Sequence, residues 1–77
     1  MSLHINIIVI DKYNAKLHFR ISKEQCLQTL LTACSQRLGV NETKLRFVIN
    51  MEEVSDLTLK IKDFNLVENE KIGLLYL

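Results

Sequence analysis

Hydrophobic and polar residues alternate over the first two segments of the chain. In residues 4–10, Ile5, Ile7 and Val9 fall on one face of an extended strand. Residues 16–21 alternate in the same way. The short polar segment between them contains Asp and Asn, which favour turns. Two alternating segments joined by a short turn predict an antiparallel β-hairpin.

Apolar residues then recur at helical spacing and predict one amphipathic helix. The members of this stripe are Leu27, Leu30, Leu31, Cys34 and Leu38. Ser22 and Gln25 have the spacing of a capping box, and Gly39 suits a left-handed C-terminal cap. We therefore predict a helix from about Glu24 to Leu38.

The rest of the chain contains further strand patterns. Residues 45–49 alternate, a short strand is expected near Val54, and the final apolar segment, residues 72–77, indicates a last strand. The order strand, strand, helix, strand, irregular segment, strand predicts an α+β ubiquitin-like β-grasp, with residues 1–77 as a single domain. A ferredoxin-like order would need a helix between the first two strands, and the turn after Asp11 is too short for one.

Composition narrows the function classes. The chain has 77 residues and a net charge of +1 with both signs mixed, so no basic surface favours nucleic acid or a membrane. No apolar stretch approaches the roughly 20 residues of a membrane span. We expect neither nucleic acid nor membrane among the partners, and a monomer for the isolated domain.

No pattern typical of an enzyme is present. The only two glycines, Gly39 and Gly73, cannot form a phosphate-binding loop, and no Cys/His spacing fits zinc. No Ser/His/Asp or paired-carboxylate arrangement can be assigned. The interpretation is a protein that is not an enzyme and holds no metal or cofactor.

The two cysteines, Cys26 and Cys34, are expected to stay reduced. On one helix they are about 12 Å apart, too far for a disulfide. Cys34 falls on the apolar stripe and is expected to be buried, whereas Cys26 falls at its margin or outside. Two free thiols are typical of a cytosolic or nuclear protein.

Several segments together resemble SUMO. They are the opening Ile5-Asn6-Ile7-Ile8-Val9, the segments LHFRI (17–21), CSQRLGV (34–40) and LRF (45–47), and KDFNL (62–66) before the final strand. The match covers nearly the whole chain and implies a SUMO-like β-grasp. SUMO is attached to targets through a terminal Gly-Gly, which does not follow the last predicted strand here.

This difference makes the chain most similar to SUMO-like domains embedded in larger proteins, and closest to those that end the RENi family of genome-maintenance proteins. That resemblance implies a nuclear DNA-repair protein whose SUMO-like module docks non-covalently on the SUMO-conjugating enzyme. One alternative is a ubiquitin-like modifier whose Gly-Gly tail has been removed; a Gly-Gly beyond Leu77 in the full-length gene would favour it. Another is a ubiquitin-like domain within an enzyme.

The resemblance also implies an acidic docking surface. SUMO meets its conjugating enzyme through acids that follow the third strand and precede the last one. The matching residues are Glu52, Glu53, Glu68 and Glu70, with Asn50 where SUMO has another acid. We expect these two segments to lie near one another, with Glu52 and Glu70 in solvent. The alternative is that they are solvated turn residues of little energetic weight.

SUMO binds short peptides in a groove between its second strand and its helix. By resemblance the residues of this groove would be His18, Phe19, Ile21, Leu30 and Arg37. Such a groove adds a peptide strand to an open sheet edge. The favoured alternative is that Phe19, Ile21 and Leu30 are core residues.

A third candidate surface follows from the β-grasp pairing of strands. Parity places Ile8, Val48 and Leu75 on the outer face of the sheet, which we expect to bring them side by side across three strands. A contiguous apolar patch is typical of a partner surface. The alternative is that the irregular segment or a terminus covers it.

Overall fold

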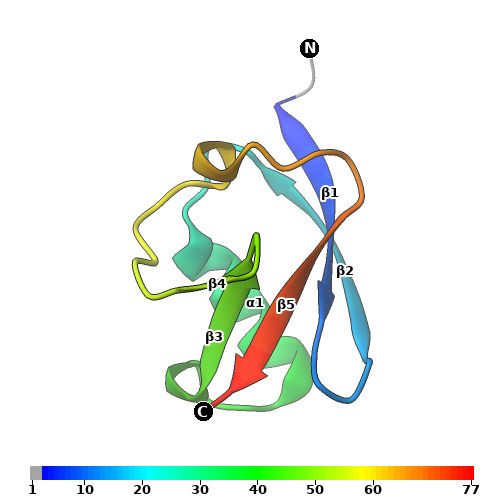
Figure 1. Cartoon of the computed structure of the whole chain (residues 1–77), viewed down its shortest axis with the longest axis vertical. Coiled ribbons are helices and arrows are strands. Elements are labelled where there is room, and N and C mark those ends of the chain that lie inside the picture. The colour runs from blue at the N-terminus through cyan, green and yellow to red at the C-terminus, as the bar shows by residue number, and fades with distance from the viewer. Residues whose placement is uncertain (1–2) are drawn as a thin grey trace.

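One α-helix packs against one mixed sheet in the computed structural model, which describes residues 3–77 (Figure 1). The strand order is β2-β1-β5-β3-β4. The strands are β1 (His4–Ile10), β2 (Lys16–Ser22), β3 (Leu45–Ile49), β4 (Glu52–Val54) and β5 (Glu70–Tyr76). The helix α1 spans Leu27–Leu38, and two 3-10 helices span Glu42–Lys44 (η1) and Ile61–Phe64 (η2).

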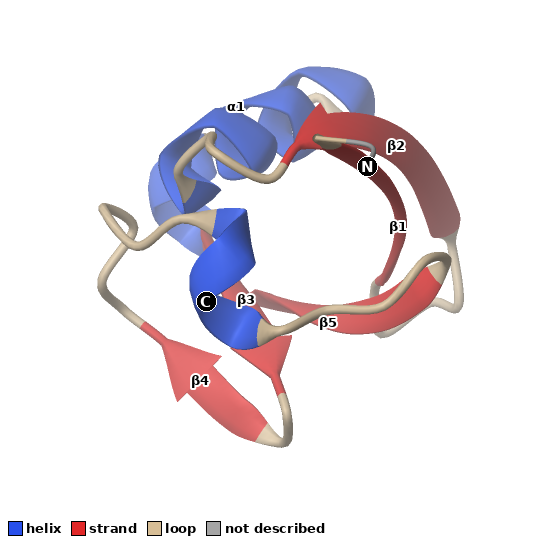
Figure 2. Ribbon diagram, turned by 90° about the horizontal axis from the view of Figure 1, so that it is seen from above, coloured by secondary structure: helices blue, strands red, loops and turns tan. Residues whose placement is uncertain are grey.

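The architecture is α+β and compatible with a β-grasp. β1 lies between β2 and β5; it is antiparallel to β2 and parallel to β5. α1 lies on the concave side of the curled sheet, and no other element in residues 3–77 covers the convex side (Figure 2). The predicted strands and their alternating burial are confirmed, including the short strand that ends at Val54.

The core fills the space between α1 and the concave face of the sheet. It consists of apolar side chains contributed by every strand, by α1 and by the segment around η2. The buried members are Ile5, Ile7, Val9, Ile21, Leu27, Leu30, Leu31, Cys34, Leu45, Phe47, Ile49, Val54, Ile61, Leu66, Ile72 and Leu74. Removal of these side chains from water is the main driving force of the fold.

The β1–β2 turn is held by one side chain. The Asp11 carboxylate accepts hydrogen bonds from the backbone N–H of Tyr13 and of Ala15, both at 2.9 Å. Asn14 takes a left-handed conformation, with φ 63°. Asx turns of this kind are the reason that Asp and Asn favour tight connections.

The helix begins three residues later than predicted. Its first two N–H groups are capped from another part of the chain: Leu27 N–H donates to the carbonyl of Leu59 at 2.8 Å, and Gln28 N–H donates to that of Leu57 at 3.0 Å. The proposed capping pair forms one of its two bonds, from Ser22 N–H to the Gln25 side-chain oxygen at 3.3 Å, but it closes a separate turn before α1, in which Gln25 N–H donates to the Ser22 carbonyl. A cap supplied by carbonyls about 30 residues downstream leaves no local sequence signal.

The other end of α1 is as predicted. Gly39 takes the left-handed conformation, with φ 68°, and its N–H donates to the Ser35 carbonyl at 2.9 Å. The predicted burial of Cys34 is confirmed, and Cys26 is partly exposed, as expected.

A two-residue loop joins β3 to β4. Ile49 pairs with Glu52, so only Asn50 and Met51 lie between the strands. Both have positive φ, 54° and 68°, as in a type I′ turn.

Candidate protein-binding surfaces

The predicted acidic residues come together at one end of the sheet. β3 and β5 are antiparallel, so the end of β3 and the start of β5 are neighbours. Glu52 and Glu53 follow the first of these positions, and Glu68 and Glu70 lie at the second. The carboxylates do not, however, form one continuous surface.

Glu52 and Glu53 project to opposite faces of β4. Glu53 is paired with Val48 on the outer face of the sheet, and its carboxylate lies 4.0 Å from the Arg46 guanidinium. Glu52 is paired with the buried Ile49 but is itself exposed. Among residues 3–77 no ion pair involves Glu52, which leaves its charge available to a partner.

The carboxylates of Glu68 and Glu70 both accept hydrogen bonds from backbone N–H groups. The Glu68 carboxylate accepts from Asn6 N–H at 2.6 Å, and the Glu70 carboxylate accepts from Val67 N–H at 2.9 Å. The expectation that Glu70 stands free in solvent is therefore wrong, because its side chain is partly buried while it closes the turn before β5. These two acids fix the backbone at the end of the sheet where β5 begins.

Only part of the predicted peptide groove borders an open surface. Ile21 and Leu30 are 6% and 1% exposed and belong to the core, so the favoured alternative is confirmed for both. His18 pairs with Ile8 and lies on the outer face, the opposite side of β2 from Phe19. Phe19 is partly buried, and the Arg37 guanidinium lies 5.2 Å from its ring centroid. Of the five residues, Phe19 and Arg37 remain between the β2 edge and α1.

The outer-face apolar residues share a face but are not side by side, which corrects the prediction. Ile8 stands opposite Lys71, Val48 opposite Gly73, and Leu75 opposite Arg46. Lys71 and Leu75 are four residues, about 13 Å, apart along β5. The mismatch arises because parity fixes the face of a side chain and leaves the register of the strands open.

The register instead places Ile10 at the centre of the outer face. Ile10 and Val48 flank Gly73 on the two neighbouring strands. A Cβ atom on Gly73 would lie 3.3 Å from the Val48 Cβ, so the Val48 side chain packs over the glycine backbone. Ile8, Ile10, Val48 and Leu75 are all partly exposed and form a shallow apolar surface around Gly73. We call these four residues with Gly73 the outer patch.

Basic residues surround the outer patch. Ile10 pairs with Lys16, Asn6 with Arg20, Ile8 with Lys71, and Leu75 with Arg46, and cross-strand partners share a face. The outer face is therefore apolar at the centre, basic at the sides and acidic only at Glu53 on β4.

Sequence reasoning missed two residues of these surfaces, Ile10 and Met51. Met51 is 96% exposed at the tip of the β3–β4 hairpin (its loop rises between β3 and β4 in Figure 1). A signal for this hairpin existed, because Asn50 follows a strand pattern, and Asn is common at the first position of two-residue turns. The second position of such a turn is normally Gly, and because Met51 occupies it here, the sequence did not predict the turn.

The two thiols differ in their chemistry. Burial raises the pKa of Cys34 to about 12. Hydrogen bonds from the Thr29 backbone N–H and the Thr29 hydroxyl lower the pKa of Cys26. Cys26 is the N-cap residue of α1, and its thiol lies 3.8 Å from the Thr29 hydroxyl.

Two further findings concern ligands and membranes. The side chains of residues 3–77 contain no group of three or more His, Cys, Asp or Glu residues placed to hold a metal ion. No helix in the same part of the chain is long and apolar enough to cross a membrane.

Comparison with protein-family models gives no match, and neither does comparison with curated proteins.

Proposed function

We propose that the chain is a SUMO-like β-grasp module that binds protein partners non-covalently and is not an enzyme. The observation that carries the proposal is the convex face of the sheet, which no element in residues 3–77 covers (Figure 2). Its outer patch is apolar, partly exposed and contiguous around Gly73. Apolar patches that a fold leaves open are typical of protein–protein surfaces.

The proposed partner is the SUMO-conjugating enzyme, and the proposed parent is a nuclear genome-maintenance protein. The resemblance to SUMO supports this partner, together with the position of the exposed acids. Glu53 lies on the outer face beside Val48 of the outer patch, and Glu52 projects from the opposite face of the same hairpin, so both can meet basic residues of the enzyme at this end of the sheet. Glu68 and Glu70 fix the adjacent turn so that the surface is preformed.

The alternative of a ubiquitin-like modifier uses the same fold. The two functions differ in whether the enzyme is bound reversibly or joined to the chain through a Gly-Gly. Incubation of the full-length gene product with activating and conjugating enzymes distinguishes them, because a modifier forms a thioester and a docking module does not.

Charge reversal tests the docking surface. We expect Glu52→Arg and Glu53→Arg each to weaken binding of the conjugating enzyme by roughly tenfold, about 1.4 kcal/mol, in a calorimetric titration. Glu24→Arg is the matched control, because it makes the same change of charge in the β2–α1 connection, where Glu24 pairs with Lys60 and Lys62. Equal affinity for both hairpin variants and the parent protein would overturn the assignment of this surface.

A further inference from the structure

Met51 is the one residue with positive φ in residues 3–77 that is neither glycine nor asparagine. Five non-glycine residues in residues 3–77 have positive φ, and four of them are asparagine: Asn14, Asn50, Asn65 and Asn69. Asparagine tolerates the left-handed region because its short polar side chain bonds locally. The fifth is Met51, with φ 68°, a conformation that is unfavourable for a long side chain.

The position of Met51 gives this exception a physical consequence. Its side chain is 96% exposed, so packing within the described part of the chain does not offset the backbone strain. The Ile49–Glu52 pair fixes the backbone at the base of the two-residue loop and so holds Met51 at the tip of the hairpin. A strained residue that the native contacts do not stabilise is expected where function selects the side chain.

The charges beside Met51 indicate what kind of surface it meets. Glu52 follows it directly, is exposed and has no ion pair among residues 3–77. Glu53 comes next, and its contact with Arg46 is long, at 4.0 Å. A protruding thioether followed by two carboxylates complements a shallow apolar pocket that has basic side chains at one side of its rim.

We infer that Met51 is the apolar anchor of the docking surface and inserts into such a basic-rimmed pocket on the SUMO-conjugating enzyme. This inference rests on the proposed function, and it adds to it the apolar residue that anchors the hairpin end of the contact. Buried apolar anchors surrounded by polar residues are typical of the positions that dominate affinity. The strain at Met51 is then retained because the side chain serves the partner and not the fold.

Stability and affinity should therefore change in opposite directions on substitution. Met51→Gly relieves the left-handed strain and should raise the thermal midpoint by about 4 °C or more. The same variant should weaken binding of the conjugating enzyme by roughly tenfold, because the apolar anchor is lost. Met51→Leu keeps a long apolar side chain at the strained position and should bind within about threefold of the parent protein.

Asn50→Gly is the matched control, because it changes the neighbouring turn residue and leaves Met51 in place. It should leave the affinity within about twofold, since asparagine already tolerates its conformation. If the parent protein binds the enzyme and Met51→Gly binds equally well, the anchor is wrong while the docking function stands. If the parent protein does not bind, the docking function and the anchor fall together.

Discussion

The β1–β2 turn and the segment of residues 50–66 show two ways in which a chain fixes its irregular parts. The turn is fixed by neighbours: Asp11 accepts from Tyr13 and Ala15 N–H, and Asn14 supplies the left-handed residue. The 50–66 segment is fixed by distant residues, since its carbonyls cap the start of α1 and Ile61 N–H donates to the Gln25 carbonyl. Local contacts leave a signal in the sequence, and distant contacts do not.

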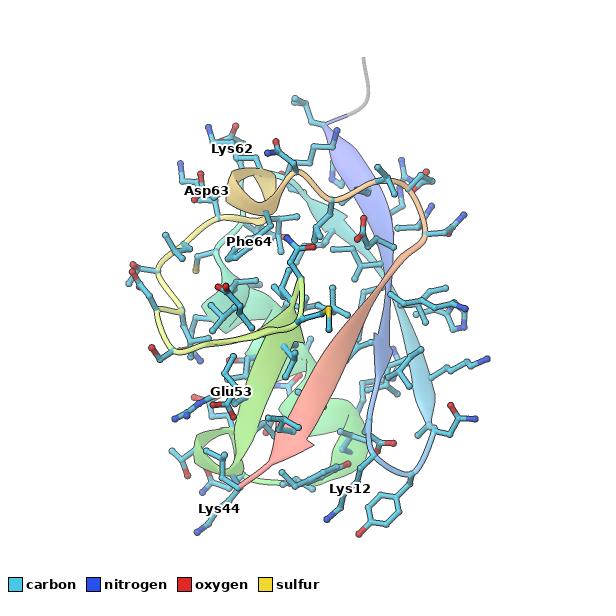
Figure 3. All side chains as sticks on the ribbon, in the orientation of Figure 1. Lys12, Lys44, Glu53, Lys62, Asp63 and Phe64 are labelled. Atoms are coloured by element: carbon cyan, nitrogen blue, oxygen red, sulfur yellow. The ribbon has the colours of Figure 1, made fainter. Side chains whose placement is uncertain are left out.

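One distant contact also reaches the β1–β2 turn. The Tyr76 hydroxyl donates to the Asp11 carboxylate at 2.8 Å, and the Lys12 ammonium lies 5.1 Å from the Tyr13 ring centroid and 5.5 Å from that of Tyr76. The far end of β5 is thereby tied to the turn. Lys12 and Lys44 lie at the opposite end of the molecule from Lys62 and Asp63 of η2 (Figure 3).

The largest expected effect comes from the 50–66 segment. Ile61 is 1% exposed and holds η2 in the core, so Ile61→Ala should destabilise the protein by about 3 kcal/mol in urea unfolding. If the segment caps α1, the amide protons of Leu27 and Gln28 should also exchange faster with solvent. Leu59→Ala is the control, because 36% of that side chain is exposed. Unchanged exchange at Leu27 in the Ile61 variant would contradict the capping role.

Substitution of Asp11 should have a smaller effect. Asp11→Ala removes three hydrogen bonds and should cost about 2 kcal/mol. Asp11→Asn distinguishes the backbone bonds from the Tyr76 bond. Both backbone bonds go to one carboxylate oxygen, which the amide retains, and the Tyr76 bond goes to the other. Tyr76→Phe removes only that last bond and should cost about 1 kcal/mol, whereas the amide of Asp11→Asn can donate to the Tyr76 hydroxyl oxygen and should cost no more. Equal losses for Asp11→Ala and Asp11→Asn would show that the backbone bonds contribute nothing.

The Asp11 contribution should depend on pH. Burial opposes ionisation, but hydrogen bonds from Ala15 N–H, Tyr76 OH and Tyr13 N–H together lower the pKa of this carboxyl below its ordinary value of 3.8. A lowered folded pKa adds stability that is fully present above the unfolded pKa and is lost as the pH falls through the folded one. The stability difference between the parent protein and Asp11→Asn should thus be constant above about pH 5 and shrink below pH 4. A difference that stays constant down to pH 2 would contradict this account.

The rates at which the two cysteines react with a thiol reagent test how α1 is oriented against the sheet and the 50–66 segment, and the test needs no substitution. Cys26 forms a β-bridge with Lys60 but remains partly exposed, and its pKa is lowered by its bonds with Thr29. Burial raises the pKa of Cys34 to about 12. A thiol reagent should label Cys26 in the native protein and Cys34 only after unfolding. Labelling in the reverse order would mean that α1 is rotated about its axis.

The same contrast explains what the sequence reveals of this fold. The strands, the Asp11 turn and the Gly39 cap follow local rules, and all were predicted correctly. The start of α1 was placed three residues early because its cap comes from Leu57 and Leu59. For the candidate surfaces, strand parity identified the outer face, but the register that makes Ile10 central depends on the pairing of Ile10 with Gly73, which lies about 60 residues later in the chain.

Docking through the hairpin and the outer patch predicts one specific pattern in solution. When the conjugating enzyme is titrated into isotopically labelled protein, the amide signals that shift should belong to the β3–β4 hairpin, including Met51, and to β5 around Gly73. These residues carry the exposed acids and the outer patch. Shifts confined to the β2–α1 side around Phe19 and Arg37, or no shifts at all, would contradict docking through the hairpin and the outer patch.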